Sequence, residues 1–163
     1  MTNPSLLHHG IFMPLLAGTC LSLVSCNDVP NGEKKELDKE VTAFADAYFG
    51  YDFDLALQHC TPESRKWLVY AASNVHEEDL ETLRSQEEGT SAEVIDYDFD
   101  SDTTGTAIVE VHRFLQTDSI GQPGRMVDQA TFSLPIVHTG GKWTVRMEGL
   151  PQSEKQGHGS DED

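Results

Sequence analysis

The clearest pattern for the architecture of the chain lies in residues 126–147, MVDQATFSLPIVHTGGKWTVRM. Apolar side chains alternate with polar ones in two runs of this stretch, as they do in a strand that buries one face. The first run contains Met126, Ala130, Phe132, Leu134 and Ile136, and the second contains Trp143, Val145 and Met147. Thr139-Gly140-Gly141 between the runs is typical of a tight hairpin turn. The stretch predicts two antiparallel strands, with a bulge or an interrupted ladder at Pro135 because proline cannot donate a hydrogen bond.

Two more alternating runs precede this stretch. Residues 92–100 place Ile95, Tyr97 and Phe99 on one face, and a longer run alternates Ala107, Val109, Val111 and Leu115. Residues 100–105, between these two runs, have the composition of a turn. Together the runs predict a four-stranded antiparallel sheet.

Before Gly89 the apolar period is helical. The first helix is expected over residues 36–50, and its apolar face consists of Leu37, Val41, Phe44, Ala45, Tyr48 and Phe49. Asp52 or Asp54 can cap a short second helix. Thr61-Pro62 starts a third helix, which we expect to continue as one stripe to about Gly89. Helices followed by strands predict an α+β fold, with N-terminal helices packed on the sheet.

The N-terminus has the composition of a secretory signal. Residues 1–27 contain no Asp, Glu, Lys or Arg, and residues 11–24 are apolar. A run of about 14 residues is too short to span a bilayer, which takes roughly 20, but it fits the apolar part of a signal peptide. Leu23-Val24-Ser25-Cys26 at its end resembles the lipobox of bacterial lipoproteins. The resemblance implies cleavage before Cys26 and lipid on its thiol; an ordinary secretory signal and a buried apolar helix are the alternatives.

These boundaries predict the domain organisation. We expect a lipoprotein signal peptide at residues 1–25, a lipidated cysteine and tether at 26–35, one α+β domain at 36–150, and a disordered acidic tail at 151–163.

The charge balance limits the partners. The chain has 28 acidic and 11 basic residues, for a net charge of −17. Because a phosphate backbone is bound by clustered Lys and Arg, nucleic acid is not expected as a partner. With Cys20 removed and Cys26 acylated, Cys60 is left without a disulfide partner, and its helical spacing from Leu57 predicts a small buried apolar residue.

Several short segments suggest a family. Phe44-Ala45-Asp46-Ala47-Tyr48, the aspartates before Leu55-Ala56-Leu57, and Gly141-Lys142-Trp143 resemble the nuclear transport factor two-like superfamily, over about residues 36–149. They look most like its small bacterial lipoproteins. The resemblance implies a curved, cone-shaped sheet around the long helix, often with a pocket inside. Members include isomerases, dehydratases, ligand binders and dimerisation modules, so the fold alone does not choose a function.

The strand register predicts one candidate site. Pairing Leu115 with Met126, and Val111 with Ala130, aligns the apolar faces of two strands and places Arg113 opposite Asp128. Both side chains would then point to the concave side of the sheet. We expect Arg113 and Asp128, with Tyr97 and Tyr48, to line a ligand pocket. The alternative is an ordinary cross-strand ion pair, which contributes about 0.2–1 kcal/mol.

These residues favour a membrane-anchored, non-catalytic domain that binds a small ligand or a partner protein. The first alternative is a pocket enzyme of isomerase or dehydratase type that uses Asp128 with Tyr97 or Tyr48, although Arg113 would hold Asp128 ionised and occupied. The second alternative is a dimerisation module. The outer face of the sheet disfavours it, because its predicted positions are mainly polar: Thr131, Ser133, Thr144 and Arg146. The histidines at positions 59, 76, 112, 138 and 158 show no pair at metal-ligand spacing on one face, and we expect no metal or cofactor.

Asn27 bears on the location, because the aspartate that resembles an inner-membrane retention signal is absent after Cys26. We therefore favour the outer membrane of the cell envelope.

Lipidation can be tested by intact mass. Protein from membranes should have the mass of a chain beginning at Cys26 plus acyl groups, and a Cys26→Ala variant should lack these groups because it has no thiol to acylate. An unacylated wild-type chain that keeps residues 1–25 would contradict the prediction.

Overall fold

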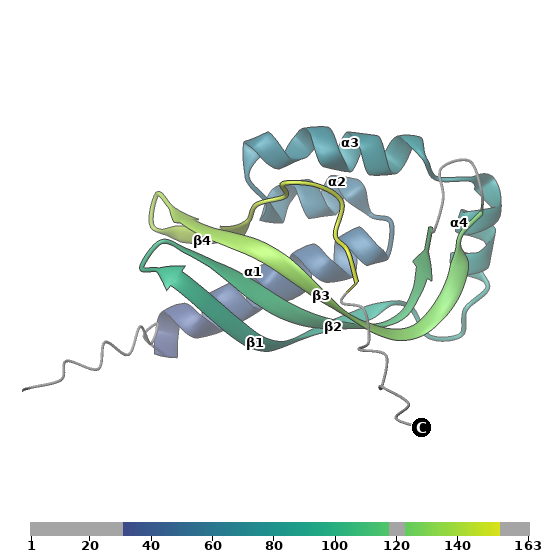
Figure 1. Ribbon diagram of the computed structural model, residues 1–163. Helices are drawn as coiled ribbons and strands as arrows, with labels where there is room; N and C mark the ends of the chain where they lie inside the picture. Colours follow the sequence, from purple (N-terminus) through teal and green to yellow (C-terminus); the bar gives the residue numbers. More distant parts are fainter. Residues whose placement is uncertain (1–30, 118–122, 154–163) are drawn as a thin grey trace, which may run out of the picture.

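The computed structural model describes residues 31–117 and 123–153, which form four α-helices and a four-stranded sheet (Figure 1). The helices are α1 (Asn31–Phe49), α2 (Phe53–Ala56), α3 (Arg65–Ser73) and α4 (Glu77–Arg84), with short 3-10 turns at Leu57–His59 and Pro62–Ser64. The strands are β1 (Ser91–Ser101), β2 (Thr104–Gln116), β3 (Arg125–Thr139) and β4 (Lys142–Val145), all antiparallel in the order β1-β2-β3-β4. This is the predicted α+β fold.

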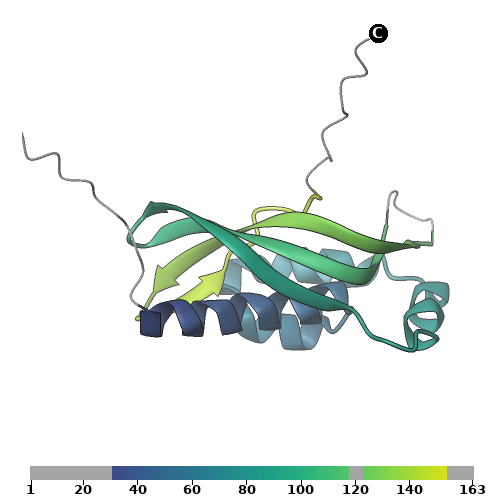
Figure 2. The same ribbon diagram turned by 90° about the horizontal axis from the view of Figure 1, so that it is seen from below.

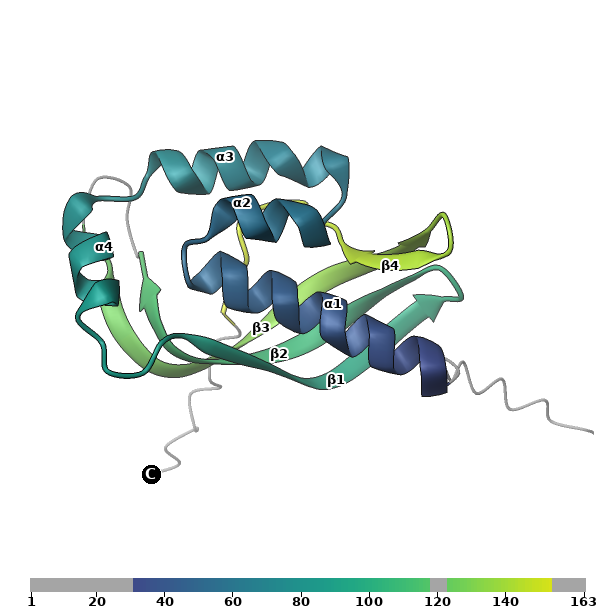
Figure 3. The same cartoon turned by 180° about the vertical axis from the view of Figure 1, so that it is seen from behind.

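Helix α1 packs against one face of the sheet, and α2 and α3 lie on the same side (Figures 2 and 3). Its predicted apolar face forms the core, with Leu37, Val41 and Phe44 fully buried. The helix starts at Asn31, so residues 31–35, which we predicted as tether, are helical. It ends before Gly50, as predicted, where a side chain would place Cβ 2.7 Å from the Asp46 carbonyl oxygen.

The predicted third helix is two helices, α3 and α4, separated by Asn74 to His76. The break has a local cause, because the Asn74 side chain turns back and donates to the Tyr70 carbonyl (2.7 Å). The next helix is fixed by Asp79, which is 1% exposed and accepts hydrogen bonds from the backbone N–H of His76 (2.9 Å) and Gly124 (2.8 Å). Asp79 therefore ties α4 to the start of β3.

The register between β2 and β3 is the predicted one. Leu115 pairs with Met126 and Val111 pairs with Ala130. Pro135 is accommodated without a bulge, opposite Thr106, and its carbonyl accepts from the Arg146 N–H (2.8 Å). The glycines of the last hairpin have φ values of 63° and 80°, as a two-residue turn between twisted strands requires.

The predicted orientation of Arg113 and Asp128 is wrong. Arg113 has a φ of 51°, and this position and Asp128 are missing from an otherwise continuous ladder. Val111 before the break and Phe114 after it belong to the buried core cluster, whereas Leu115 is buried outside that cluster. The core-facing positions of β2 therefore change from odd to even at the break. Asp128 is exposed. At this end of the sheet β2 and β3 curve towards α4 (Figure 1).

Strand β1 contains a second irregularity. Its register with β2 shifts between Val94 and Asp96, which leaves Ile95 as the extra residue of a bulge. Ile95 is 52% exposed, whereas Val94 and Tyr97 pack against the core. The prediction that Ile95 shares a face with Tyr97 is therefore wrong, because a bulge reverses the alternation.

The segment between α2 and α3 holds the C-terminal end of the sheet. Ser64 is fully buried, and its Oγ accepts from the Met147 N–H (2.8 Å) and lies 3.0 Å from Thr61 Oγ1. Thr61 N–H donates to the Val145 carbonyl (2.8 Å). These bonds join the first half of the chain to β4 and the residues after it.

Replacing Ser64 with alanine should lower the free energy of unfolding by about 1–3 kcal/mol, because the buried Met147 N–H loses its acceptor. Urea denaturation measures the change. Ser73→Ala is the matched control, since the exposed Ser73 hydroxyl only donates to the Tyr70 carbonyl on the same helix. Equal, small losses in both variants would contradict this role for Ser64.

Candidate functional site

A cavity of about 350 Å³ lies among the C-terminal end of α1, α3 and the curved parts of β2 and β3. Seven aromatic side chains line it: Tyr48, Phe49, Tyr51, Phe53, Tyr70, Phe114 and Phe132. The rest of the lining is aliphatic (Ala71, Val75, Leu115, Leu150 and Pro151) or polar (Asn74, Gln116, Thr117, Gln152 and Ser153). The volume falls in the range of small-molecule sites, roughly 300–1,000 Å³.

The turn after α1 supplies one wall. Tyr51 has a φ of 62°, a conformation that side chains rarely adopt, and hydrogen bonds from Tyr51 N–H to the Tyr48 carbonyl and from Asp52 N–H to the Ala47 carbonyl hold it there. Asp52 then caps α2, as predicted, by accepting from the Leu55 N–H (3.0 Å). This reversal places the rings of Tyr48 and Tyr51 5.8 and 5.6 Å from that of Phe53.

The bend in the sheet supplies another wall. Because the alternation changes at Arg113, Phe114 points inward, where its ring centroid lies 5.6 Å from Phe49 and 5.4 Å from Phe132. Phe49 and Phe132 are 4.4 Å apart. The chain after β4 also contributes: Ser153 forms an antiparallel bridge with Phe132. Residues 151–153, which we predicted as the start of a disordered tail, therefore line the cavity.

The cavity offers neutral hydrogen-bonding groups. Burial, with a smaller contribution from Asp79, raises the pKa of Tyr51 to about 12, and its hydroxyl donates to the Leu115 carbonyl (3.3 Å). Burial also raises the pKa of Tyr48 well above its ordinary value. Both phenols are therefore protonated at neutral pH. The described lining contains no Asp, Glu, His, Lys, Arg or Cys.

Of the four predicted pocket residues, only Tyr48 lines this cavity. Tyr97 lies against α1, where its hydroxyl donates to Asp38 Oδ1 (2.7 Å). The Arg113 guanidinium donates to the Gly89 carbonyl (3.3 Å) and to Ser91 Oγ (3.2 Å), and it lies 3.5 Å from Glu88 Oε2. Asp128 is exposed, and among the described residues the ion pair of Arg113 is with Glu88 and not with Asp128. The cause is the bend, which turns both positions out of the ladder.

Sequence reasoning missed the aromatic lining, although a signal was present. Residues 48–53, YFGYDF, hold four aromatic residues around the expected end of a helix. The core face of one helix cannot accommodate all four of these rings at its end. Their number therefore indicates a second apolar surface. Phe114 gave a weaker signal. It is an apolar residue next to the apolar Leu115, in a strand where apolar and polar residues should alternate.

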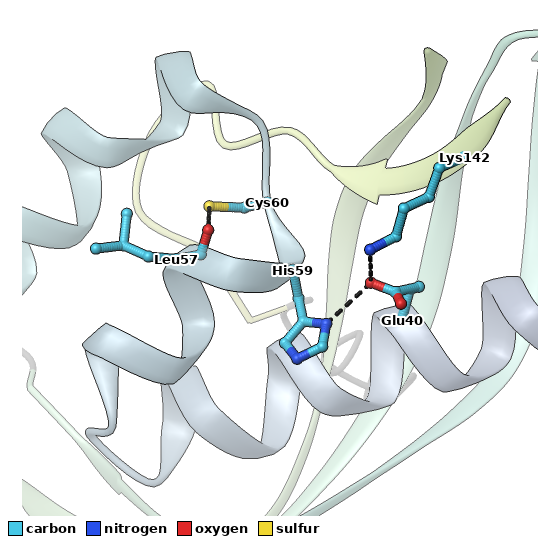
Figure 4. Close-up of polar contacts among 5 residues, drawn as sticks. All are labelled: Glu40, Leu57, His59, Cys60 and Lys142. Atoms are coloured by element: carbon cyan, nitrogen blue, oxygen red, sulfur yellow. Dashed lines mark hydrogen bonds and ion pairs between the residues drawn. The ribbon is translucent and has the colours of Figure 1, made fainter. Parts of the chain in front are cut away.

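A charged cluster lies at the middle of α1 (Figure 4). Glu40 is 13% exposed, and its Oε2 accepts from His59 Nδ1 and Lys142 Nζ, each at 2.9 Å. Burial alone would raise the pKa of Glu40, but the hydrogen bonds from His59 and Lys142 outweigh it and lower this pKa. A second hollow of about 340 Å³ adjoins the cluster.

Cys60 takes no part in this cluster. Its Sγ donates to the Leu57 carbonyl (3.8 Å) and points away from His59 (Figure 4). Burial raises the pKa of its thiol, which keeps it protonated. The prediction of a small buried residue is confirmed.

Within residues 31–117 and 123–153, no three His, Cys, Asp or Glu side chains are grouped so that they could hold a metal ion. No helix among these residues is long and apolar enough to cross a bilayer. Cys26 and the signal segment lie outside the described residues.

No family model matches the chain, and no curated protein matches it. Solved structures similar to it include an NTF-2 like protein of unknown function from Shewanella oneidensis MR-1 (11% identity, TM-score 0.47, 74% of this chain and 97% of that one). A candidate aromatic ring hydroxylase from Novosphingobium aromaticivorans shares 12% identity, with a TM-score of 0.44 over 78% and 96% of the two chains. An Ntf2 like protein involved in plasmid conjugation shares 17%, with a TM-score of 0.36 over 80% and 52%.

The Glu40 cluster makes stability depend on pH. A carboxylate whose pKa is lowered by folding stabilises the fold above its unfolded pKa, near 4.5, and loses this effect as the pH falls through the folded value. Glu40→Gln should therefore lower the free energy of unfolding at pH 7 by about 1 kcal/mol, and by much less at pH 3. Urea denaturation at the two pH values measures the difference. Glu36→Gln, at an exposed position of the same helix, is the control; an equal, pH-independent effect of both changes would contradict the assignment.

Proposed function

We propose that this chain is a non-catalytic binding protein that holds a small, mainly apolar ligand in the aromatic cavity while lipid on Cys26 tethers it to a membrane. The observation that carries the proposal is the cavity of about 350 Å³ with seven aromatic side chains in its lining. Ligand sites are typically concave, mostly apolar and furnished with a few polar groups that set orientation. The tyrosine hydroxyls and amides in the lining are groups of this kind.

The chemistry of the lining favours binding over catalysis. General acid–base catalysis needs a group whose pKa lies near the working pH. Burial raises the pKa values of Tyr48 and Tyr51, which line the cavity, away from neutrality. Asp128, the base of the enzymatic alternative, is exposed and outside the lining. The described part of the chain therefore gives that alternative no support at this cavity.

The proposed tether limits where the cavity can lie relative to the membrane. Cys26 is five residues before Asn31, a distance of roughly 17 Å at full extension. The cavity lies at the far end of α1, whose 19 residues extend roughly 27 Å from Asn31. A domain held by Cys26 can therefore present the cavity away from the bilayer, where it would take its ligand from the aqueous phase or from a partner protein of the envelope. The lipobox and Asn27 support a tether in the outer membrane.

Fluorescence of N-phenyl-1-naphthylamine, a neutral dye that brightens in apolar sites, tests the binding proposal. The full-length chain with Cys26→Ala needs no detergent for an acyl group, and it should bind the dye. Adding Ala71→Trp should weaken binding at least tenfold, because Ala71 lines the cavity and an indole would fill it.

Ala72→Trp is the matched control. Ala72 is exposed on the same helix and does not line the cavity, so this variant should bind the dye as the parent does. The proposal is wrong if the parent does not bind, or if both tryptophans weaken binding equally.

A further inference from the structure

We infer that the ligand of the aromatic cavity is a neutral, flat aromatic molecule with a hydrogen-bond acceptor, such as an aryl ketone, and that the Tyr48 hydroxyl binds this acceptor. The inference rests on the proposed function and adds the ligand class. Three features of the cavity lead to it: the ring geometry of its walls, the hydroxyl of Tyr48, which has no hydrogen-bond partner among the described residues, and the charge of its surroundings.

The walls suit a flat ring. The cavity lies between the turn after α1, with Tyr51 and Phe53, and the curved strands, with Phe114 and Phe132. Several of these rings already meet edge to face, at centroid distances of 5.4–5.6 Å. Such contacts are directional, because the edge of an aromatic ring is positive and its face negative. An aromatic ligand can continue this pattern, whereas an aliphatic chain can only fill volume.

Tyr48 provides the recognition group. Tyr51 donates to the Leu115 carbonyl and Tyr97 to Asp38, but the Tyr48 hydroxyl makes no hydrogen bond with another described residue. Tyr48 lines the cavity, and its ring is fixed by packing against Phe44 (5.8 Å) and Phe53 (5.8 Å). A phenol that is held in one orientation in an apolar cavity contributes most to the free energy of binding when the ligand supplies a hydrogen-bond acceptor.

Charge excludes ionic ligands. The described lining contains no cationic side chain that could replace the hydration of an anion, and the chain has a net charge of −17. Arg125 approaches the lining, but its Nη2 donates to Gln116 Oε1 (3.0 Å). The described lining likewise contains no carboxylate for a cationic ligand. The cavity therefore selects neutral molecules.

Three naphthalenes of similar shape separate these features: 2-acetonaphthone, which is neutral with an acceptor; 2-ethylnaphthalene, which lacks the acceptor; and 2-naphthoate, which is an anion. Each competes with N-phenyl-1-naphthylamine for the full-length Cys26→Ala chain. The ketone should bind about fivefold to tenfold more tightly than the hydrocarbon, which is the effect of one hydrogen bond. The carboxylate should bind at least tenfold more weakly than the ketone.

Tyr48→Phe should remove the advantage of the ketone and leave the affinity for 2-ethylnaphthalene unchanged. If Tyr48 had only a structural role, the substitution would lower the affinity for both ligands by the same factor. Tyr97→Phe deletes the same atom outside the cavity and should keep the parental order of the three ligands.

The outcomes distinguish this inference from the proposed function. The ligand class is wrong if the dye binds but 2-naphthoate competes as well as the ketone. It is also wrong if Tyr48→Phe lowers the affinities for the ketone and the hydrocarbon equally. In both cases the proposed binding function still holds. If the parent chain does not bind the dye, both are wrong.

Discussion

Arg113 holds a left-handed backbone conformation in β2, opposite Asp128 in β3, and the shape of the sheet depends on this pair of positions. Both strands exchange their inward and outward faces there while their register stays the same. Without the exchange, Arg113 and Asp128 would point into the apolar side of the sheet and Phe114 would point to solvent. The guanidinium instead contacts Gly89, Ser91 and Glu88 next to the start of β1, which stabilises the turned-out position.

The cavity follows from this bend and from the turn at Tyr51. The bend carries the ends of β2 and β3 away from the plane of the sheet and towards α4, so α1 alone does not cover them (Figures 1 and 2). Asp79 ties α4 to Gly124 and keeps these ends in place. The aromatic residues after α1 then line one cavity together with Phe114 and Phe132.

Much of this architecture is predictable from the sequence. The core face of α1, the cap at Asp52, the glycine hairpin and the β2–β3 register all follow from local patterns, because periodicity and turn chemistry act over a few residues. The orientation of Arg113 and Asp128 was not predictable in this way. A bulge, or a break at facing positions of two strands, exchanges the inward and outward faces of a strand without changing the kinds of residue in it. The bulge at Ile95 is a second example. The helix break at Asn74 depends on a single side chain that competes with the backbone.

The candidate site was predicted only through Tyr48. The other three residues were chosen on the assumption of unbroken alternation, which places charged groups inside a sheet that in fact turns them out. The residues that line the cavity come from five separate parts of the chain, and only the YFGYDF run at 48–53 marks one of them locally. When the bend of a sheet brings the lining residues together from separate segments, no single segment of the sequence identifies the site.

If the cavity at the bend is the ligand site, its backbone amides should respond to a bound ligand. Titration of the ¹⁵N-labelled chain with 2-acetonaphthone, followed by amide chemical shifts, measures this response. We expect the largest changes at Phe49, Ala71 and Phe114, around the cavity. Changes concentrated instead at Gly141, Lys142 and Trp143, beside the second hollow, would contradict it.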